Sequence, residues 1–169
     1  MRLFFALWPD EALRGRLARA GAELAQRAQG KAVPAAKVHM TLAFLGEVAQ
    51  DRFAAAADAA SRVKGEAFDF TLDEVGAFRS ARVAWVGSAG GHPALTALQS
   101  QLAGQLRREG FELESRPFAA HVTLARRISR PIAREAAEPI AWRVRDFALV
   151  ASDTGKGTYE VVKRWGLGE

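Results

Sequence analysis

The sequence contains no cysteine, and this absence excludes several kinds of chemistry at once. Without thiols the protein has no disulfide framework, no cysteine-ligated zinc or iron–sulfur site and no cysteine nucleophile. Histidine is also scarce, with 3 residues in a chain of 169. The hydrophobic fraction of 49% and the charged fraction of 25% are ordinary globular values. We therefore expect one folded domain over residues 1–169, without disordered or fibrous segments.

Long apolar runs are absent as well. The N-terminal sequence MRLFFALWPD has a short apolar run, but Pro9 and Asp10 end it far short of the ~20 residues that a membrane span needs. We interpret this run as a first strand and expect a cytoplasmic protein with no membrane partner. The net charge is +5, and most of the basic residues are arginine, which suits bidentate contacts with phosphate. This modest excess is consistent with an anionic partner or simply with a solvated surface.

The hydrophobic pattern of the first half predicts a strand, a helix and a second strand. Large apolar residues indicate a strand over residues 2–8, and leucines at helical spacing predict a helix over about 10–28. Alternation then favours a strand over 38–45. An alanine-rich helix over about 50–63 and a strand over 68–72 follow, before a turn around residues 76–80.

The second half repeats this order. A strand is predicted over 82–87, a helix opens at Pro93 and ends at Gly110, and a further strand covers 119–126. Residues 130–139 contain two prolines and are expected to form a surface loop or a short helix. The segments 144–150 and 158–165 predict a terminal hairpin. The chain thus contains two β-α-β units, at about 2–45 and 82–126, which form an internal repeat.

Two of the three histidines occupy matching places in this repeat. The sequence HMTL begins at His39 and HVTL begins at His121, each after the same strand and helix. In a strand, residues two apart share a face, so each motif presents an imidazole beside the hydroxyl of Thr41 or Thr123. Two such strands related by a pseudo-twofold axis would face each other across a cleft. Either motif alone could be an ordinary strand, but the matched pair favours a functional site.

Opposed histidines suit a reaction that needs a general base and a general acid together, because imidazole titrates near neutral pH. Cleavage of a phosphodiester fits this description. Thr41 and Thr123 could then donate hydrogen bonds to the non-bridging phosphate oxygens as negative charge grows on them.

Other catalytic patterns are missing from the sequence. Two distant histidines without cysteine or nearby acidic ligands are too few for a closed zinc site. No Gly-x-Ser-x-Gly element is present, and GSAGG at 87–91 lacks the Lys and Ser/Thr of a P-loop. His92 is interpreted as a residue at the start of a helix. We expect no metal and no cofactor.

Five segments carry a resemblance to a known family. They are RLFFAL at 2–7, VHMTLAFLGEV at 38–48, RVAWVG at 82–87, RPFAAHVTLAR at 116–126 and YEVVKRW at 159–165. With these segments the chain resembles the RNA 2′,3′-cyclic phosphodiesterases, also called 2′-5′ RNA ligases, of the 2H phosphoesterase superfamily. The resemblance implies an α+β, bilobal fold with antiparallel sheets lining a central cleft and helices outside. The repeat predicts the same arrangement independently, although not the order of the strands.

The resemblance also implies roles for single residues. It makes His39 the general acid that protonates the departing ribose O3′ and His121 the base that activates water, so that a 2′-phosphate forms. The residues alone support the pair without orienting it. Thr41 and Thr123 match the residues that hold the phosphate.

Two further matches are less direct. Arg126 matches an arginine near the substrate phosphate, although strict alternation from His121 puts it on the opposite strand face unless the strand bends, bulges or ends. Phe5 aligns with an aromatic residue that can stack on a base, and it could equally belong to the core.

The implied activity is metal-independent hydrolysis of 2′,3′-cyclic phosphate ends of RNA or nucleotides, with 2′-5′ joining as the reverse reaction. Two alternatives stay open. One is a basic RNA-binding module without turnover, and the other is a phosphodiesterase for 2′-5′ oligonucleotides or cyclic nucleotides. A monomer is expected, because the predicted elements leave no apolar stripe unpaired.

Overall fold

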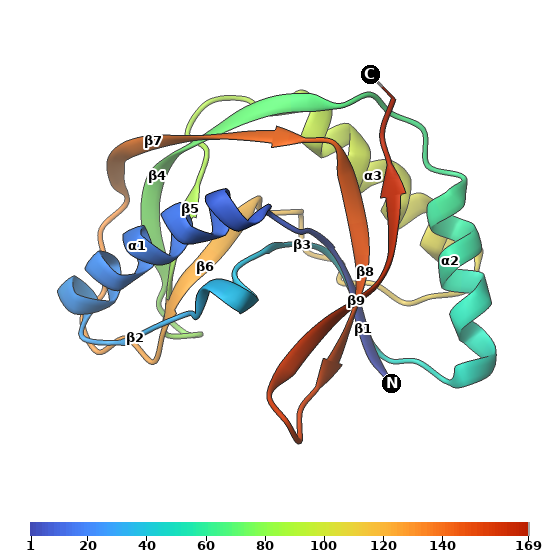
Figure 1. Cartoon of the computed structure of the whole chain (residues 1–169), viewed down its shortest axis with the longest axis horizontal. Helices are drawn as coiled ribbons and strands as arrows, with labels where there is room; N and C mark the ends of the chain where they lie inside the picture. The colour runs from blue at the N-terminus through green and yellow to red at the C-terminus, as the bar shows by residue number, and fades with distance from the viewer. Residues whose placement is uncertain (169) are drawn as a thin grey trace.

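The computed structural model, which describes residues 1–168, has two antiparallel sheets, two helices (α1 and α3) packed on them and a third helix (α2) packed on α3 (Figure 1). The predicted bilobal α+β fold is confirmed. In chain order the elements are β1 (Arg2–Leu7), α1 (Glu11–Ala28), β2 (Lys31–Ala32), η1 (Ala35–Lys37), β3 (Met40–Glu47), η2 (Gln50–Arg52), α2 (Phe53–Ser61), β4 (Phe68–Phe78), β5 (Val83–Gly87), α3 (Pro93–Arg108), β6 (His121–Arg126), β7 (Glu135–Val144), β8 (Asp146–Asp153) and β9 (Thr158–Gly166).

The strands of the two sheets are arranged in corresponding order. The first is β3-β1-β8-β9 and the second is β2-β6-β5-β4-β7, with antiparallel pairing throughout. When the short strand β2 is set aside, β6-β5-β4-β7 corresponds strand by strand to the first sheet. The two HxT motifs therefore lie on corresponding strands, β3 and β6.

Each helix of the repeat packs against the motif strand of the other half. Helix α1 follows β1 but packs on β6, and α3 follows β5 but packs on β3. Gly21 of α1 lies so close to β6 that a Cβ atom there would be 2.9 Å from the Leu124 carbonyl oxygen. Gln99 of α3 donates a hydrogen bond from Nε2 to the Leu42 carbonyl oxygen at 3.1 Å. Both motif strands are thus supported by a helix from the opposite repeat.

Local sequence explains where α1 begins and ends. Asp10 caps its first turn by accepting a hydrogen bond from the Leu13 amide at 2.8 Å. The buried side of the helix carries the leucines that set its period. Gln29 ends the helix in the left-handed conformation, with φ of 52°.

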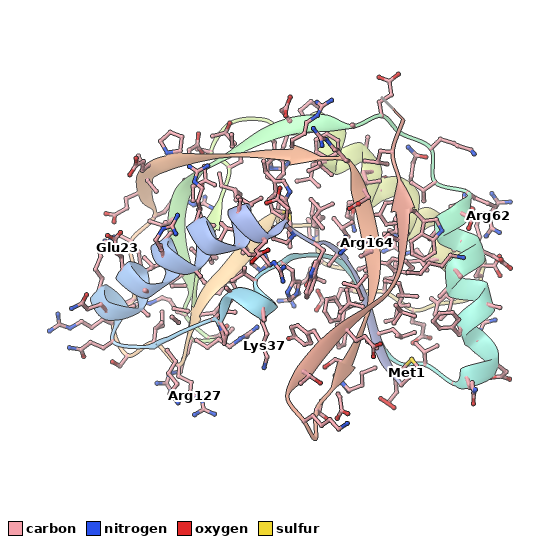
Figure 2. All side chains as sticks on the ribbon, in the orientation of Figure 1. Met1, Glu23, Lys37, Arg62, Arg127 and Arg164 are labelled. Carbon is pink, nitrogen blue, oxygen red and sulfur yellow. The ribbon has the colours of Figure 1, made fainter. Side chains whose placement is uncertain are left out.

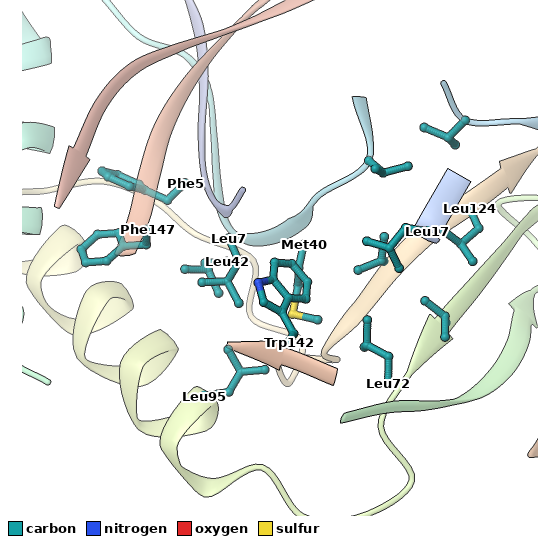
Figure 3. Close-up of a cluster of buried hydrophobic side chains, with 14 of the residues drawn as sticks. Phe5, Leu7, Leu17, Met40, Leu42, Leu72, Leu95, Leu124, Trp142 and Phe147 are labelled. Carbon is teal, nitrogen blue, oxygen red and sulfur yellow. The ribbon is translucent and has the colours of Figure 1, made fainter. Parts of the chain in front are cut away.

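Most of the buried side chains form one cluster that spans both halves of the molecule (Figure 3). Leu17 of α1 and Leu124 of β6 lie together at one end of the cluster in the view, and Phe5 and Phe147 lie at the other (Figure 3). A continuous core of this kind holds the two sheets at a fixed relative position. The motif strands between them are positioned accordingly.

The expected loop over residues 130–139 is wrong in its second half, where β7 begins at Glu135. Pro139 concealed this strand, because proline is rare inside sheets. The structure tolerates it since β7 is an edge strand and its register with β4 shifts between Leu72 and Glu74, close to the proline. The turn expected around 76–80 is also shorter, because β4 continues to Phe78.

No helix within residues 1–168 is both long and apolar enough to cross a membrane.

Candidate active site

The two histidine side chains are held in the same way. Nδ1 of His39 lies 2.7 Å from the carbonyl oxygen of Lys37, and Nδ1 of His121 lies 2.7 Å from that of Ala119. A carbonyl oxygen only accepts, so each Nδ1 carries a proton and donates it. Nε2 of each neutral ring is then the atom that can take up or release a proton. The geometry assigns one tautomer to both rings.

The threonines lie beside these rings. The Thr41 hydroxyl is 3.0 Å from Nε2 of His39. Thr41, His121 and Thr123 line a cavity of about 740 Å³, hereafter the central cavity. His39 does not itself line this cavity, but its Nε2 contacts the Thr41 hydroxyl that does, and it is close enough to His121 for the charge of that ring to influence it. The structure thus brings the four motif residues together.

Arg126 also lines the central cavity, and a β-bulge explains how. In the β5–β6 ladder Trp85 pairs with Thr123 and Ala84 pairs with Ala125, so Leu124 has no partner. The extra residue reverses the alternation, which buries both Leu124 and Ala125 and turns Arg126 outward. The side chain of Arg126 therefore shares the cavity with Thr123, as a bulge allows and strict alternation does not.

The first motif has the same bulge and reveals a residue that the sequence analysis missed. Thr41 pairs with Ala6 and Ala43 pairs with Phe5, so Leu42 is the unpaired residue. Phe44 consequently occupies the position equivalent to Arg126, is 48% exposed and lines the central cavity. Both motifs share the sequence HxTLAx, with Phe44 or Arg126 at its last position, and this shared pattern could have identified Phe44 as a cavity residue.

Phe5 lies elsewhere, and the expected base-stacking role is wrong. Its side chain has no exposed surface, and its ring centroid is 5.7 Å from that of Trp165 and 6.3 Å from that of Phe147. Along β1 it points into the main core, while its neighbour Phe4 points to the opposite face, toward His39. The aromatic residues that line the central cavity are Phe44, Phe78 and Phe118, and Phe44 is the most exposed of them.

Three aromatic rings surround His39. The centroids of Phe4, Tyr159 and Trp8 lie 4.9, 5.4 and 5.6 Å from the imidazole, with Trp8 nearly parallel to it. Burial among them lowers the pKa of His39 from 6.5 to about 4, against the opposing effect of the hydrogen bond to Lys37. The positive charges of Arg126 and His121 lower this pKa further. His39 is therefore neutral in the free protein at pH 7.

This shift predicts an acid-sensitive fold. The folded pKa of His39 is below the unfolded value of about 6.5, so the unfolded state binds more protons and stability falls as pH drops through this range. Between pH 7 and pH 5 we expect this group to remove about 1 to 2 kcal/mol from the free energy of unfolding. Urea denaturation at both pH values measures this loss.

Two variants serve as controls for that measurement. His39→Asn keeps a side-chain NH near the Lys37 carbonyl but does not titrate, so its stability should change less between pH 7 and pH 5 than that of the wild type. His92→Asn should behave like the wild type. Identical pH dependence in wild type and His39→Asn would contradict the shift.

The sequence and the fold are similar to those of known proteins. The model of the 2′-5′ RNA ligase superfamily matches residues 9–156. The chain belongs to this superfamily. It is 33% identical over 169 residues to the RNA 2′,3′-cyclic phosphodiesterase of Escherichia coli K12, covering 98% of this chain and 96% of that protein. An RNA 2′,3′-cyclic phosphodiesterase of Archaeoglobus fulgidus is 34% identical over 129 residues, covering 75% of this chain and 72% of the other.

Solved structures of the superfamily share the fold. The crystal structure of E. coli LigT complexed with 3′-AMP matches with a TM-score of 0.90 and 33% identity, covering 99% of this chain and 98% of that chain. The crystal structure of TT0787 from Thermus thermophilus matches with a TM-score of 0.84 and 28% identity over the whole of both chains. These matches confirm the predicted relation of this chain to the RNA 2′,3′-cyclic phosphodiesterases.

Proposed function

We propose that this protein hydrolyses 2′,3′-cyclic phosphate ends of RNA or nucleotides to 2′-phosphates. One observation carries the proposal. The two histidines of the repeat have the same tautomer; His121, Thr41 and Thr123 line one cavity, and His39 lies against the Thr41 hydroxyl at its wall. The relatives named RNA 2′,3′-cyclic phosphodiesterase support the choice of substrate.

In the proposed reaction, Nε2 of His121 accepts a proton from water as the water oxygen attacks the phosphorus. The bond from phosphorus to O3′ breaks, and His39 donates a proton from Nε2 to O3′. The product carries a 2′-phosphate and a free 3′-hydroxyl. Hydroxyls of Thr41 and Thr123 donate to the non-bridging oxygens, and the Arg126 guanidinium balances their charge. Joining to a 5′-hydroxyl would use the same groups with acid and base exchanged.

The acid role of His39 requires a change of protonation on binding. His39 is neutral in the free protein, because its pKa is about 4. An anionic phosphate placed between the rings offsets the charge of Arg126 and stabilises the His39 imidazolium, so the pKa of His39 rises while His121 is neutral and can act as the base. Substrate binding thus supplies the charged form that the acid step needs.

The deciding experiment is incubation of the protein, in EDTA, with an oligoribonucleotide that ends in a 2′,3′-cyclic phosphate. Phosphorus NMR follows the product, and the double variant His39→Ala/His121→Ala is the control. A 2′-phosphate is expected. A 3′-phosphate would mean that O2′ leaves and that His39 and His121 have exchanged roles. If the protein binds the RNA but does not convert it, the proposal is wrong and the protein is an RNA-binding module. If it cleaves only 2′-5′ linkages, its substrate is a different phosphodiester.

A further inference from the structure

A second pocket lies next to the central cavity, on the other side of Arg126. It has a volume of about 190 Å³ and is lined by residues 31–34, Lys37, Arg126, Arg127 and Tyr159. We name it the β2 pocket. Half of its eight lining residues are lysine or arginine, and none is acidic. Arg126 lines both hollows, so whatever occupies the central cavity can continue into this pocket.

The four cations of the β2 pocket have no acidic partner. Residues 1–168 contain seven ion pairs, and none of them involves Lys31, Lys37, Arg126 or Arg127. Figure 2 shows Lys37 and Arg127 projecting on the same side of the molecule, between the β2–β6 edge and the β8–β9 hairpin. Uncompensated positive charge gathered in a hollow attracts anions.

The backbone holds these charges together at a cost. Lys31 lies directly opposite Arg126 in the β2–β6 ladder, where like charges destabilise a sheet. Arg127 has φ of 53°, a left-handed conformation that few residues other than glycine adopt. Both features place a cation at the β2 pocket. A bound anion would offset the repulsion between these cations.

The β2 pocket also contacts His39 through Tyr159 and Lys37. The Tyr159 ring lies 5.4 Å from the His39 imidazole, and Nζ of Lys37 lies 5.6 Å from the centre of the Tyr159 ring. Lys37 also supplies the carbonyl that holds His39. A polyanion whose terminal phosphate lies between the histidines would therefore pass directly over these cations.

We propose that the β2 pocket binds the RNA backbone phosphates that precede the cyclic end, so that the enzyme favours RNA ends over mononucleotides. This rests on the proposed function, because a chain whose 3′ end is at the histidines can extend only in the 5′ direction. The exposed Phe44 and Arg126 side chains border the central cavity, and the Lys31, Lys37 and Arg127 cations take the chain beyond it.

The test compares three substrates that differ only in length: adenosine 2′,3′-cyclic phosphate, the dinucleotide ApA with a cyclic end, and an octamer with a cyclic end. The variant is Lys31→Gln/Arg127→Asn, because asparagine tolerates the left-handed backbone at 127. The matched control, Arg108→Gln/Lys64→Gln, removes the same charge from exposed positions outside both hollows. Values of kcat/KM are measured between 50 and 300 mM salt.

We expect the Lys31→Gln/Arg127→Asn variant to lose roughly 10-fold in kcat/KM on the octamer at low salt and less than twofold on the mononucleotide. For this variant, the slope of log kcat/KM against log salt concentration on the octamer should be smaller in magnitude by about 1.4, which is about 0.7 for each of the two lost phosphate contacts. The control should match the wild type on all three substrates. Equal losses on all three substrates, or no loss on the octamer, would contradict the proposal that the β2 pocket binds RNA phosphates.

Failure of the proposed function gives a different result. In that case the wild-type protein opens none of the three substrates. Fluorescence anisotropy with a labelled octamer then tests independently whether the β2 pocket binds RNA. Weaker and less salt-dependent binding by Lys31→Gln/Arg127→Asn than by the control supports it, and equal binding by the two overturns it.

Discussion

Replacing either His39 or His121 with alanine is expected to lower the turnover of a 2′,3′-cyclic phosphate by roughly 10²- to 10⁴-fold. Each ring presents Nε2 as its exchangeable nitrogen, because Nδ1 is bonded to a main-chain carbonyl. Without His121 no group at this position removes the proton of the attacking water, and without His39 the ribose oxygen leaves as an alkoxide. Single-turnover rates measure the chemical step directly.

The remaining histidine provides the control. His92 precedes α3, and within residues 1–168 its ring has one hydrogen-bond partner, the hydroxyl of Thr96. His92→Ala should therefore turn over like the wild type. If His39 and His121 act as a unit, the double variant should be little worse than the poorer single variant, because losses of cooperating groups are not additive. Wild-type turnover in either folded single variant would contradict two-histidine catalysis.

Much of this site could be predicted because strand alternation is a local property. The HxT spacing alone places His39 and Thr41 on one face, and the structure puts Met40 between them in the core. The histidine-bearing strands and the helix before each were recognisable from hydrophobic period. The order of the strands was not, because α1 and α3 each pack on the motif strand of the other repeat and long-range pairing leaves no local pattern.

The errors come from residues where alternation fails. The bulges at Leu42 and Leu124 change which side chains face the central cavity, so Phe44 was missed and Arg126 seemed misplaced. Phe5 was misassigned since β1 is apolar on both faces, and apolarity alone does not separate core from cavity. The low pKa of His39 depends on rings from β1, the residue after it and β9, and this proximity exists only in the folded chain.

The second large effect concerns the threonines. Thr41→Val and Thr123→Val should each lower turnover by about 10²-fold, because valine keeps the shape of threonine but cannot donate to a phosphate oxygen as charge develops. No hydrogen bond holds the Thr123 hydroxyl within residues 1–168, so it can turn to the substrate without breaking one. Single-turnover kinetics on a cyclic-phosphate dinucleotide measure both losses.

Thr41 starts from a different state, and this makes the two variants distinguishable. Its hydroxyl donates to Nε2 of neutral His39 at 3.0 Å. When a bound phosphate raises the pKa of His39 and the ring takes up a proton from solvent, Nε2 no longer accepts, and the Thr41 hydroxyl is released to donate to the phosphate. Thr41→Val should therefore shift the acidic limb of the pH–rate profile as well as lower the rate, whereas Thr123→Val should lower the rate alone. Serine at either position should restore most of the activity, and equal losses in the serine and valine variants would show that packing, rather than the hydroxyl, is what these positions supply.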